Sequence, residues 1–152
     1  MKSFIPGVTI RGICATLPDR VSRFADELKA FPFPEKTSIR LGKVMGFKEH
    51  RISDPATTPC DLASYTLDYL FHTGKLAREE LDAIIVVSQT ADHPVPGNSK
   101  VIHGQLGLSG DTHCVDLYEN CTGFISGLYA SSAMIATGAQ KIALITAEAG
   151  AC

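Results

Sequence analysis

Runs of apolar residues predict the strands of a core sheet. Residues 83–87 are continuously apolar, as expected for a strand covered on both faces. Residues 8–15, 114–117 and 141–147 are also apolar enough for core strands, and the last of them is expected to be buried. A shorter extended segment is predicted at 48–53.

Segments whose apolar residues recur with helical spacing separate these strands. The spacing of apolar positions predicts helices over 23–30, 38–45, 62–71 and 98–106. Asp61 is expected to cap the third helix, which Gly74 closes. Alternating strands and helices indicate an α/β layered domain with a mixed or largely parallel sheet.

The loops fall where proline and glycine gather. Prolines mark loops at 31–34 and 54–59, and the polar segment 88–97 follows the most apolar strand. Loops at the carboxyl ends of such strands commonly carry binding residues, so 88–97 is a candidate binding loop. The glycines of 104–110 follow a helix and predict a helix exit instead of a phosphate-binding turn.

One junction carries candidate chemistry. The strand at 114–117 gives way at Asn120 and Cys121 to a helix rich in small residues, which Gly138 ends. Unpaired amides and the macrodipole at a helix start favour a thiolate, so Cys121 is the candidate nucleophile. Gly123 and Gly127 predict close packing, and hence an internal helix with a buried but reachable thiol.

Composition limits the alternatives. The 152 residues are 45% hydrophobic and 20% charged with a net charge of −2, which fits one compact domain without a basic stripe for nucleic acid or anionic membrane. No run approaches the ~20 apolar residues that span a bilayer, and no signal peptide is recognised, so a cytoplasmic location is expected. Five cysteines without a C-x-x-C pair indicate free thiols.

Other reactive side chains have ordinary explanations. His93, His103 and His113 are spaced unlike zinc ligands, so no metal site is expected, and no cofactor is implied. Glu119 and Glu148 are weak candidates for a carboxylate near the thiol. The tyrosines at 65 and 69 predict a core or interface position.

Several motifs together resemble the ketoacyl synthase III family of thiolase-fold condensing enzymes. The segment from Asp116 through Cys121 to Gly123 and Phe124 resembles the family's nucleophile region. The further matching segments are 138–141, 7–13 with Leu17 and Pro18, 46–52, 81–88 and 94–96. The match spans nearly the whole chain but about half of a family member.

The resemblance implies a fold, a domain and a reaction. Residues 1–152 would form the N-terminal half of a thiolase-like domain, with a mixed sheet covered by helices and a buried nucleophile helix. Cys121 would accept an acyl group from a thioester, and a malonyl-type extender would then be condensed with it in fatty-acid or polyketide synthesis. The family's His and Asn partners belong to the second half, so this chain is expected to be incomplete for condensation.

The substrate-binding residues depart from the family. Members that use coenzyme A starters carry Trp and Arg where this chain has Arg40 and Val44. Arg40 or Lys43 could contact a phosphate, which leaves coenzyme A and acyl carrier protein open as donors. Val95 stands where the family often has a bulky residue that reaches a partner's acyl pocket.

Three origins and two other functions remain open at this point. The chain could be a piece of a longer synthase, which we favour, one subunit of a split enzyme, or a degenerate domain. It could also be a non-catalytic interaction domain that forms a homodimer through the strand from Cys114 to Leu117. A thiol hydrolase is a third, weaker possibility.

Overall fold

The computed structural model describes residues 4–46 and 48–149, which divide into two compact units. Within those ranges the main unit comprises residues 4–16 and 57–149, and the small unit comprises 17–46 and 48–56. The main unit contains α3 (Pro59–His72), the 3₁₀ turn η1 (Arg78–Glu80), β3 (Ala83–Val87), α4 (Asn98–Leu106), β4 (His113–Leu117), α5 (Gly123–Ala136) and β5 (Ile142–Thr146).

The main unit is built on a parallel sheet with strand order β4-β3-β5. Val87 at the end of β3 lies opposite Leu117 of β4 and Thr146 of β5, so the three carboxyl ends share one edge. Every residue of the central strand is buried. The expected α/β fold with a parallel sheet is therefore confirmed.

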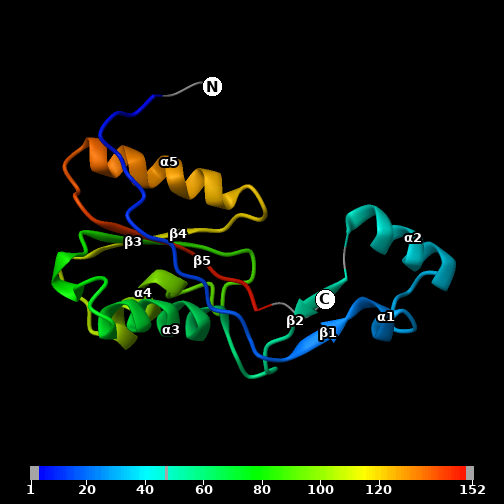
Figure 1. Cartoon of the computed structure of the whole chain (residues 1–152). Helices are drawn as coiled ribbons and strands as arrows, with labels where there is room; N and C mark the ends of the chain where they lie inside the picture. The colour runs from blue at the N-terminus through cyan, green and yellow to red at the C-terminus, as the bar shows by residue number, and fades with distance from the viewer. Residues whose placement is uncertain (1–3, 47, 150–152) are drawn as a thin grey trace. The chain divides into compact units, whose positions relative to one another are not determined.

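Helices cover both faces of this sheet. Figure 1 shows α5 on one face, with α3 and α4 on the other. The core lies mainly between β3, α3 and α4, and its buried members are Cys60, Ala63, Leu67, Phe71, Leu81, Ile84, Val86, Ile102, Leu108 and Ala147. The apolar stripe of α3 thus meets the apolar run of β3, as their sequence periods require.

The helix α5 packs closely on the sheet through its glycines. A Cβ added to Gly127 would lie 2.5 Å from Leu144 Cδ1, and one added to Gly123 would lie 2.4 Å from Val87 Cγ1. Only the glycine side of the helix is buried, however, and Ile125 is 65% exposed. The expectation of an internal helix is wrong for the described residues, because no described element covers its outer side.

Most predicted bounds agree with the structure. The helix predicted over 98–106 matches α4. The helix predicted to begin at Asn120 and Cys121 and to end at Gly138 corresponds to α5, which is shorter at both ends. The strand expected at 141–147 is β5, but it is half-buried instead of buried, because within the described sheet it is an edge strand paired with β3 alone. The glycine-rich segment after α4 is a helix exit, with Gly107 in the left-handed region at φ 57°.

The start of α3 differs from the expectation in its cap. Thr58 is the N-cap, and its hydroxyl accepts a hydrogen bond from the Asp61 amide at 3.2 Å. The Asp61 carboxylate accepts one from the Thr58 amide at 2.9 Å, which completes a capping box. Asp61 is therefore the third helical residue, and the helix begins at Pro59, which suits a first-turn position.

The strand predicted over 8–15 does not form. Those residues have no regular secondary structure, and Ile13 is 89% exposed. An apolar run becomes a strand only where a partner supplies hydrogen bonds, and no described strand pairs with this one. The segment is attached nearby by a 2.7 Å hydrogen bond between the hydroxyls of Thr16 and Thr66.

The small unit contains β1 (Val21–Arg23), α1 (Phe24–Glu27), α2 (Glu35–Met45) and β2 (Glu49–Arg51). The helix predicted over 23–30 is shorter, because the chain is still extended at Arg23, where β1 pairs with β2 antiparallel. The helix α2 ends at Gly46 as predicted, with φ 68°. Gly42 of α2 leaves room for Phe24, whose Cε1 would lie 2.4 Å from an added Cβ.

No helix among the described residues has the length and apolar character needed to cross a bilayer.

Candidate active site

Cys121 lies in the turn that joins β4 to α5. The Gly123 amide donates to the Asn120 carbonyl at 2.8 Å, which closes the turn around the cysteine. Thr122 is the N-cap of α5, so Cys121 lies one residue before the cap and two before the first helical residue, near the unpaired first amides of the helix. The position confirms the predicted strand-to-helix junction, whereas the expectation of a buried thiol is wrong, since Cys121 is exposed.

The sheet brings other loops to the same edge as this turn. The Ser88 amide donates to the Leu117 carbonyl at 3.1 Å, and the Ala147 amide donates to the Val87 carbonyl at 3.1 Å. The segments after β3, β4 and β5 therefore start side by side. In parallel sheets this is the edge where ligands bind.

Asp116 fixes the end of β4 to the start of α4. Its largely buried carboxylate accepts hydrogen bonds from the Ser99 amide at 2.7 Å, the Ser99 hydroxyl at 2.6 Å and Lys100 Nζ at 2.7 Å. Burial opposes the charged form, but the hydrogen bonds from Lys100 and Ser99 outweigh it and lower the pKa of the Asp116 carboxyl. Gly97 makes room, because an added Cβ would lie 2.2 Å from Asp116 Oδ2.

Two further carboxylates lie at this edge. Glu119 accepts a hydrogen bond from the Ser126 hydroxyl at 2.7 Å, across the Cys121 turn. Glu148, just after β5, accepts from the Gln89 amide at 2.7 Å and from the Thr90 hydroxyl at 2.5 Å. Glu148 thus ties the loop after β5 to the loop after β3.

The other described cysteines are less suited to nucleophilic chemistry. Burial and the carboxylate of Asp92 raise the pKa of the Cys60 thiol to about 12, so it stays protonated at neutral pH. Burial also raises the pKa of the half-buried Cys114 thiol, against an opposing effect of Lys100. Cys14, in the irregular N-terminal segment, is partly exposed.

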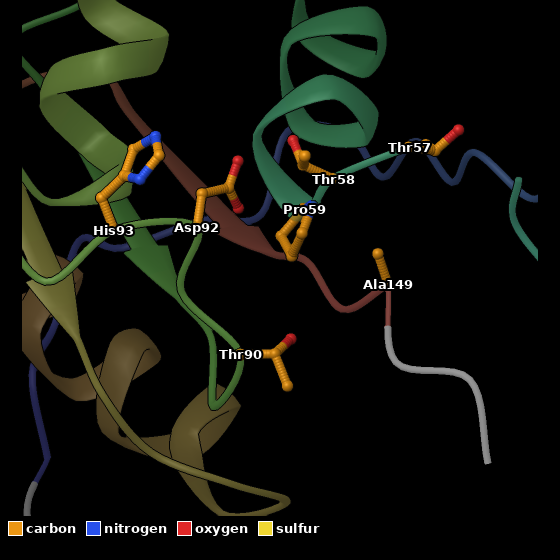
Figure 2. A pocket seen from close by; sticks show the side chains of 7 residues that line it. All are labelled: Thr57, Thr58, Pro59, Thr90, Asp92, His93 and Ala149. Carbon is orange, nitrogen blue, oxygen red and sulfur yellow. The ribbon is translucent and has the colours of Figure 1, made fainter. Parts of the chain in front are cut away.

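A shallow hollow of about 260 Å³ opens beside the start of α3. Figure 2 shows it between the loop after β3 and the beginning of α3, with Thr90, Asp92 and Thr58 around it. Its lining is Thr57, Thr58, Pro59, Thr90, Asp92, His93 and Ala149. Cys121 is not among these residues, so the hollow does not by itself form an acyl pocket around the thiol.

The predicted substrate-binding residues fall in different units. Val95 is in the loop after β3 and is 85% exposed. Arg40 and Lys43 are exposed residues of α2 in the small unit, and Lys36 lies on the same side of that helix one turn earlier. No salt bridge among the described residues involves these three cations.

The structure also shows the surroundings of the predicted tyrosines and of the possible metal ligands. Tyr65 and Tyr69 are 65% and 53% exposed, so they are not core residues. The described residues contain no group of three histidine, cysteine or acidic side chains able to hold a metal ion. The hydrogen bond from Ser126 to Glu119, and those from Ser99 and Lys100 to Asp116, were not predicted. No sequence motif marks pairs that meet only after helices pack on strands.

Comparison with known proteins gives the context of this site. No model of a known protein family matches the chain. A Campylobacter jejuni protein described as a candidate 3-oxoacyl-[acyl-carrier-protein] synthase 3 is 33% identical over 149 residues, covering 97% of this chain and 42% of the relative. A beta-ketoacyl-[acyl-carrier-protein] synthase III of Desulfitobacterium hafniense is 35% identical over 100 residues, covering 66% of this chain and 30% of the relative.

Solved structures agree with these relatives. A beta-ketoacyl-[acyl carrier protein] synthase III of Thermus thermophilus superposes with a TM-score of 0.74 at 30% identity, covering 90% of this chain and 41% of that one. A second 3-oxoacyl-(acyl-carrier-protein) synthase III gives a TM-score of 0.77 at 26% identity, covering 90% of this chain and 40% of that one.

The parallel sheet, its flanking helices and these superpositions define a protein of the thiolase-like condensing class. Within that class, the chain belongs to the ketoacyl synthase III family and corresponds to the N-terminal portion of its members. It spans 42% of the length of the Campylobacter relative, so it represents less than half of such a protein.

Proposed function

We propose that this chain is the nucleophile-bearing part of a ketoacyl synthase III-type acyltransferase. The observation that carries the proposal is the exposed Cys121 at the junction of β4 and α5, at the carboxyl edge of the sheet. Its thiolate would attack the carbonyl carbon of an acyl thioester. The new carbon–sulfur bond forms as the donor's thiolate leaves, and backbone amides at the turn would stabilise the oxyanion.

The rest of the reaction follows from the family. The acyl-Cys121 intermediate would be condensed with a malonyl-type extender in fatty-acid or polyketide synthesis, within the cytoplasm. Acylation is the step that Cys121 itself would carry, and residues 1–152 would form the N-terminal half-domain of a thiolase-like fold.

Acylation is tested directly by intact-mass spectrometry with peptide mapping. The chain is incubated with acyl-coenzyme A and acyl-carrier thioesters beside Cys121→Ser and the matched control Cys14→Ser. We expect one acyl adduct on the peptide that contains Cys121, retained in Cys14→Ser and absent from Cys121→Ser. An adduct spread over several cysteines, or none with any donor, would contradict the proposal.

The basic side of α2 would receive the donor's anionic part. Lys36, Arg40 and Lys43 lie three or four residues apart, which places them along one side of the helix. Both a nucleotide phosphate and an acidic carrier protein would be attracted there. Arg40→Glu with Lys43→Glu should slow acylation about tenfold, and less so as salt rises. Arg11→Glu with Lys75→Glu, two exposed cations of the main unit, is the charge-matched control, and equal slowing in both double variants would exclude a role for α2.

Val95 would help to select the acyl chain. Its exposed side chain is in the loop after β3, at the same edge as Cys121. Val95→Phe should shift the preferred starter toward shorter chains, measured as relative acylation rates across a series of acyl donors. An unchanged ranking would remove Val95 from the acyl site.

The second candidate function is an interaction domain, favoured by the position of β4. This strand is at an edge of the described sheet, so its outer backbone groups could pair with a second copy. Light scattering during gel filtration should then give twice the 16.3 kDa mass of one chain. A mass of one chain at every concentration would rule out this homodimer.

A further inference from the structure

Glu119 lies two residues before the exposed thiol of Cys121. The Ser126 hydroxyl of α5 donates a hydrogen bond to Glu119 Oε2 at 2.7 Å. This partly buried bond connects residues seven apart in the sequence, and Cys121 lies between them. The loop that bears the thiol is thus joined to the first turns of the helix by two side chains.

Close packing holds the same turn from another side. A Cβ added to Gly123 would lie 3.0 Å from the Glu119 Cβ and 2.4 Å from Val87 Cγ1. The Glu119 side chain therefore rests against the bare Cα of Gly123, whose amide also closes the turn onto Asn120. Residues on both sides of Cys121 are fixed independently.

We propose that Glu119 and Ser126 form a tether that positions Cys121 for reaction. The Thr122 side chain makes no capping hydrogen bond, so the start of α5 lacks the usual side-chain cap. A carboxylate held at this end is favoured by the helix macrodipole. The tether limits the number of conformations that the Cys121 turn can adopt. The turn therefore loses less conformational entropy when the thiol is brought to a carbonyl carbon. This role for Glu119 is one of positioning, and it rests on the proposed function of Cys121.

Paired substitutions distinguish the effect of the hydrogen bond between Glu119 and Ser126 from the effect of the Glu119 charge. Glu119→Ala and Ser126→Ala remove the bond, whereas Glu119→Gln keeps an acceptor oxygen and Ser126→Thr keeps the hydroxyl. Ser132→Ala is the matched control, because among the described residues the Ser132 hydroxyl bonds to the Leu128 carbonyl within α5 and to no other group. Each chain is assayed for acylation of Cys121, for its alkylation by iodoacetamide, and for hydrogen exchange in the peptide containing residues 118–126.

The alanine variants should acylate and alkylate at least about fivefold more slowly, with faster exchange in that peptide. Glu119→Gln, Ser126→Thr and Ser132→Ala should stay within about twofold of the starting rates. Alanine variants indistinguishable from the starting chain would overturn the proposal. The proposal would also fail if Glu119→Gln slowed acylation and alkylation as much as Glu119→Ala does. The negative charge of Glu119, and not its hydrogen bond, would then be the cause of the slowing.

The readouts also distinguish this proposal from the proposed function. If no thioester acylates Cys121, the acyltransferase assignment fails. Alkylation and exchange still report the tether in that case, because neither depends on an acyl donor. Unchanged exchange at β3 in every variant verifies that the sheet is intact.

Discussion

Single side chains decide how charge is held at the carboxyl edge of the main sheet. Asp116 accepts three hydrogen bonds from Ser99 and Lys100, and its side chain is only 8% exposed. Three donors compensate the carboxylate for the water that it loses. Asp116 thereby connects β4 with α4. Because β4 leads to Cys121, this connection also anchors the strand before the thiol.

Replacing Asp116 by Asn should destabilise the fold by about 1–3 kcal/mol, because Lys100 loses its partner and one acceptor is replaced by a donor. The pKa of the carboxyl is lowered in the folded state, so its contribution is present above the unfolded pKa and is lost as pH falls through the folded pKa. Urea unfolding at neutral and acidic pH should show a smaller acid-induced loss of stability in Asp116→Asn. If both chains lost the same stability on acidification, Asp116 would not be the source of that loss.

Cys60 should make the protein sensitive to alkali. Its pKa is raised from 9.0 to about 12 in the folded state, so the unfolded chain loses this proton first as pH rises. Its contribution is present below pH 9 and declines toward pH 12, by up to about 1.4 kcal/mol per pH unit. Urea unfolding at pH 7 and pH 10.5 should show that the free energy of unfolding falls less in Cys60→Ala than in the starting chain. Cys14→Ala, the control, should decline like the starting chain.

At the scale of elements, packing overrides helix propensity in α5. Glycine costs a helix about 1 kcal/mol relative to alanine, yet Gly123 and Gly127 both lie where a Cβ would collide with the sheet. The pattern of small residues predicted this helix and its close approach. Which side is buried depends on the contacts with β3 and β5.

Gly127→Ala should therefore destabilise the protein by about 1–3 kcal/mol despite its better helix propensity, since the new Cβ would lie 2.5 Å from Leu144 Cδ1. Gly104 of α4 is the matched control, with nothing within 4 Å of an added Cβ. Gly104→Ala should stabilise by up to about 1 kcal/mol. Thermal or urea unfolding measures both, and a stabilising Gly127→Ala would show that the sheet yields to the helix.

Agreement between sequence and structure varies by element for a physical reason. The helix α4 was predicted to the residue, because its period and the glycines around it are local signals. The segment 8–15 was mistaken for a strand, because its apolar pattern does not reveal whether a partner strand exists. The cap of α3 was misplaced by three residues, since Thr58 and Asp61 both suit a helix start and only their reciprocal bonds distinguish them.

At the scale of the whole molecule, stability is concentrated around β3. This strand is buried along its length and has a paired strand on each side. The described N-terminal segment, by contrast, takes part in no sheet. We therefore expect β3 to have a higher local stability than the N-terminal segment.

Hydrogen exchange should reproduce this order. Amides of β3 should exchange most slowly, because opening them requires the loss of both neighbouring strands. Amides of residues 8–15 should exchange fastest among the apolar segments. Mass spectrometry of exchanged peptides measures both, and slow exchange at 8–15 would reveal a pairing that the structure does not contain.

The sequence by itself determined the α/β class, the order of the α-helices and strands from α3 to β5, the family resemblance and the position of Cys121 at a strand-to-helix junction. These follow from residue periods, glycines and a short motif, all of which are local along the chain. Tertiary structure decided that the thiol is exposed, that Glu119 meets Ser126, and that Asp116 meets Ser99 and Lys100. Those features depend on how helices pack against strands, because residues far apart in the sequence become neighbours only when the core forms.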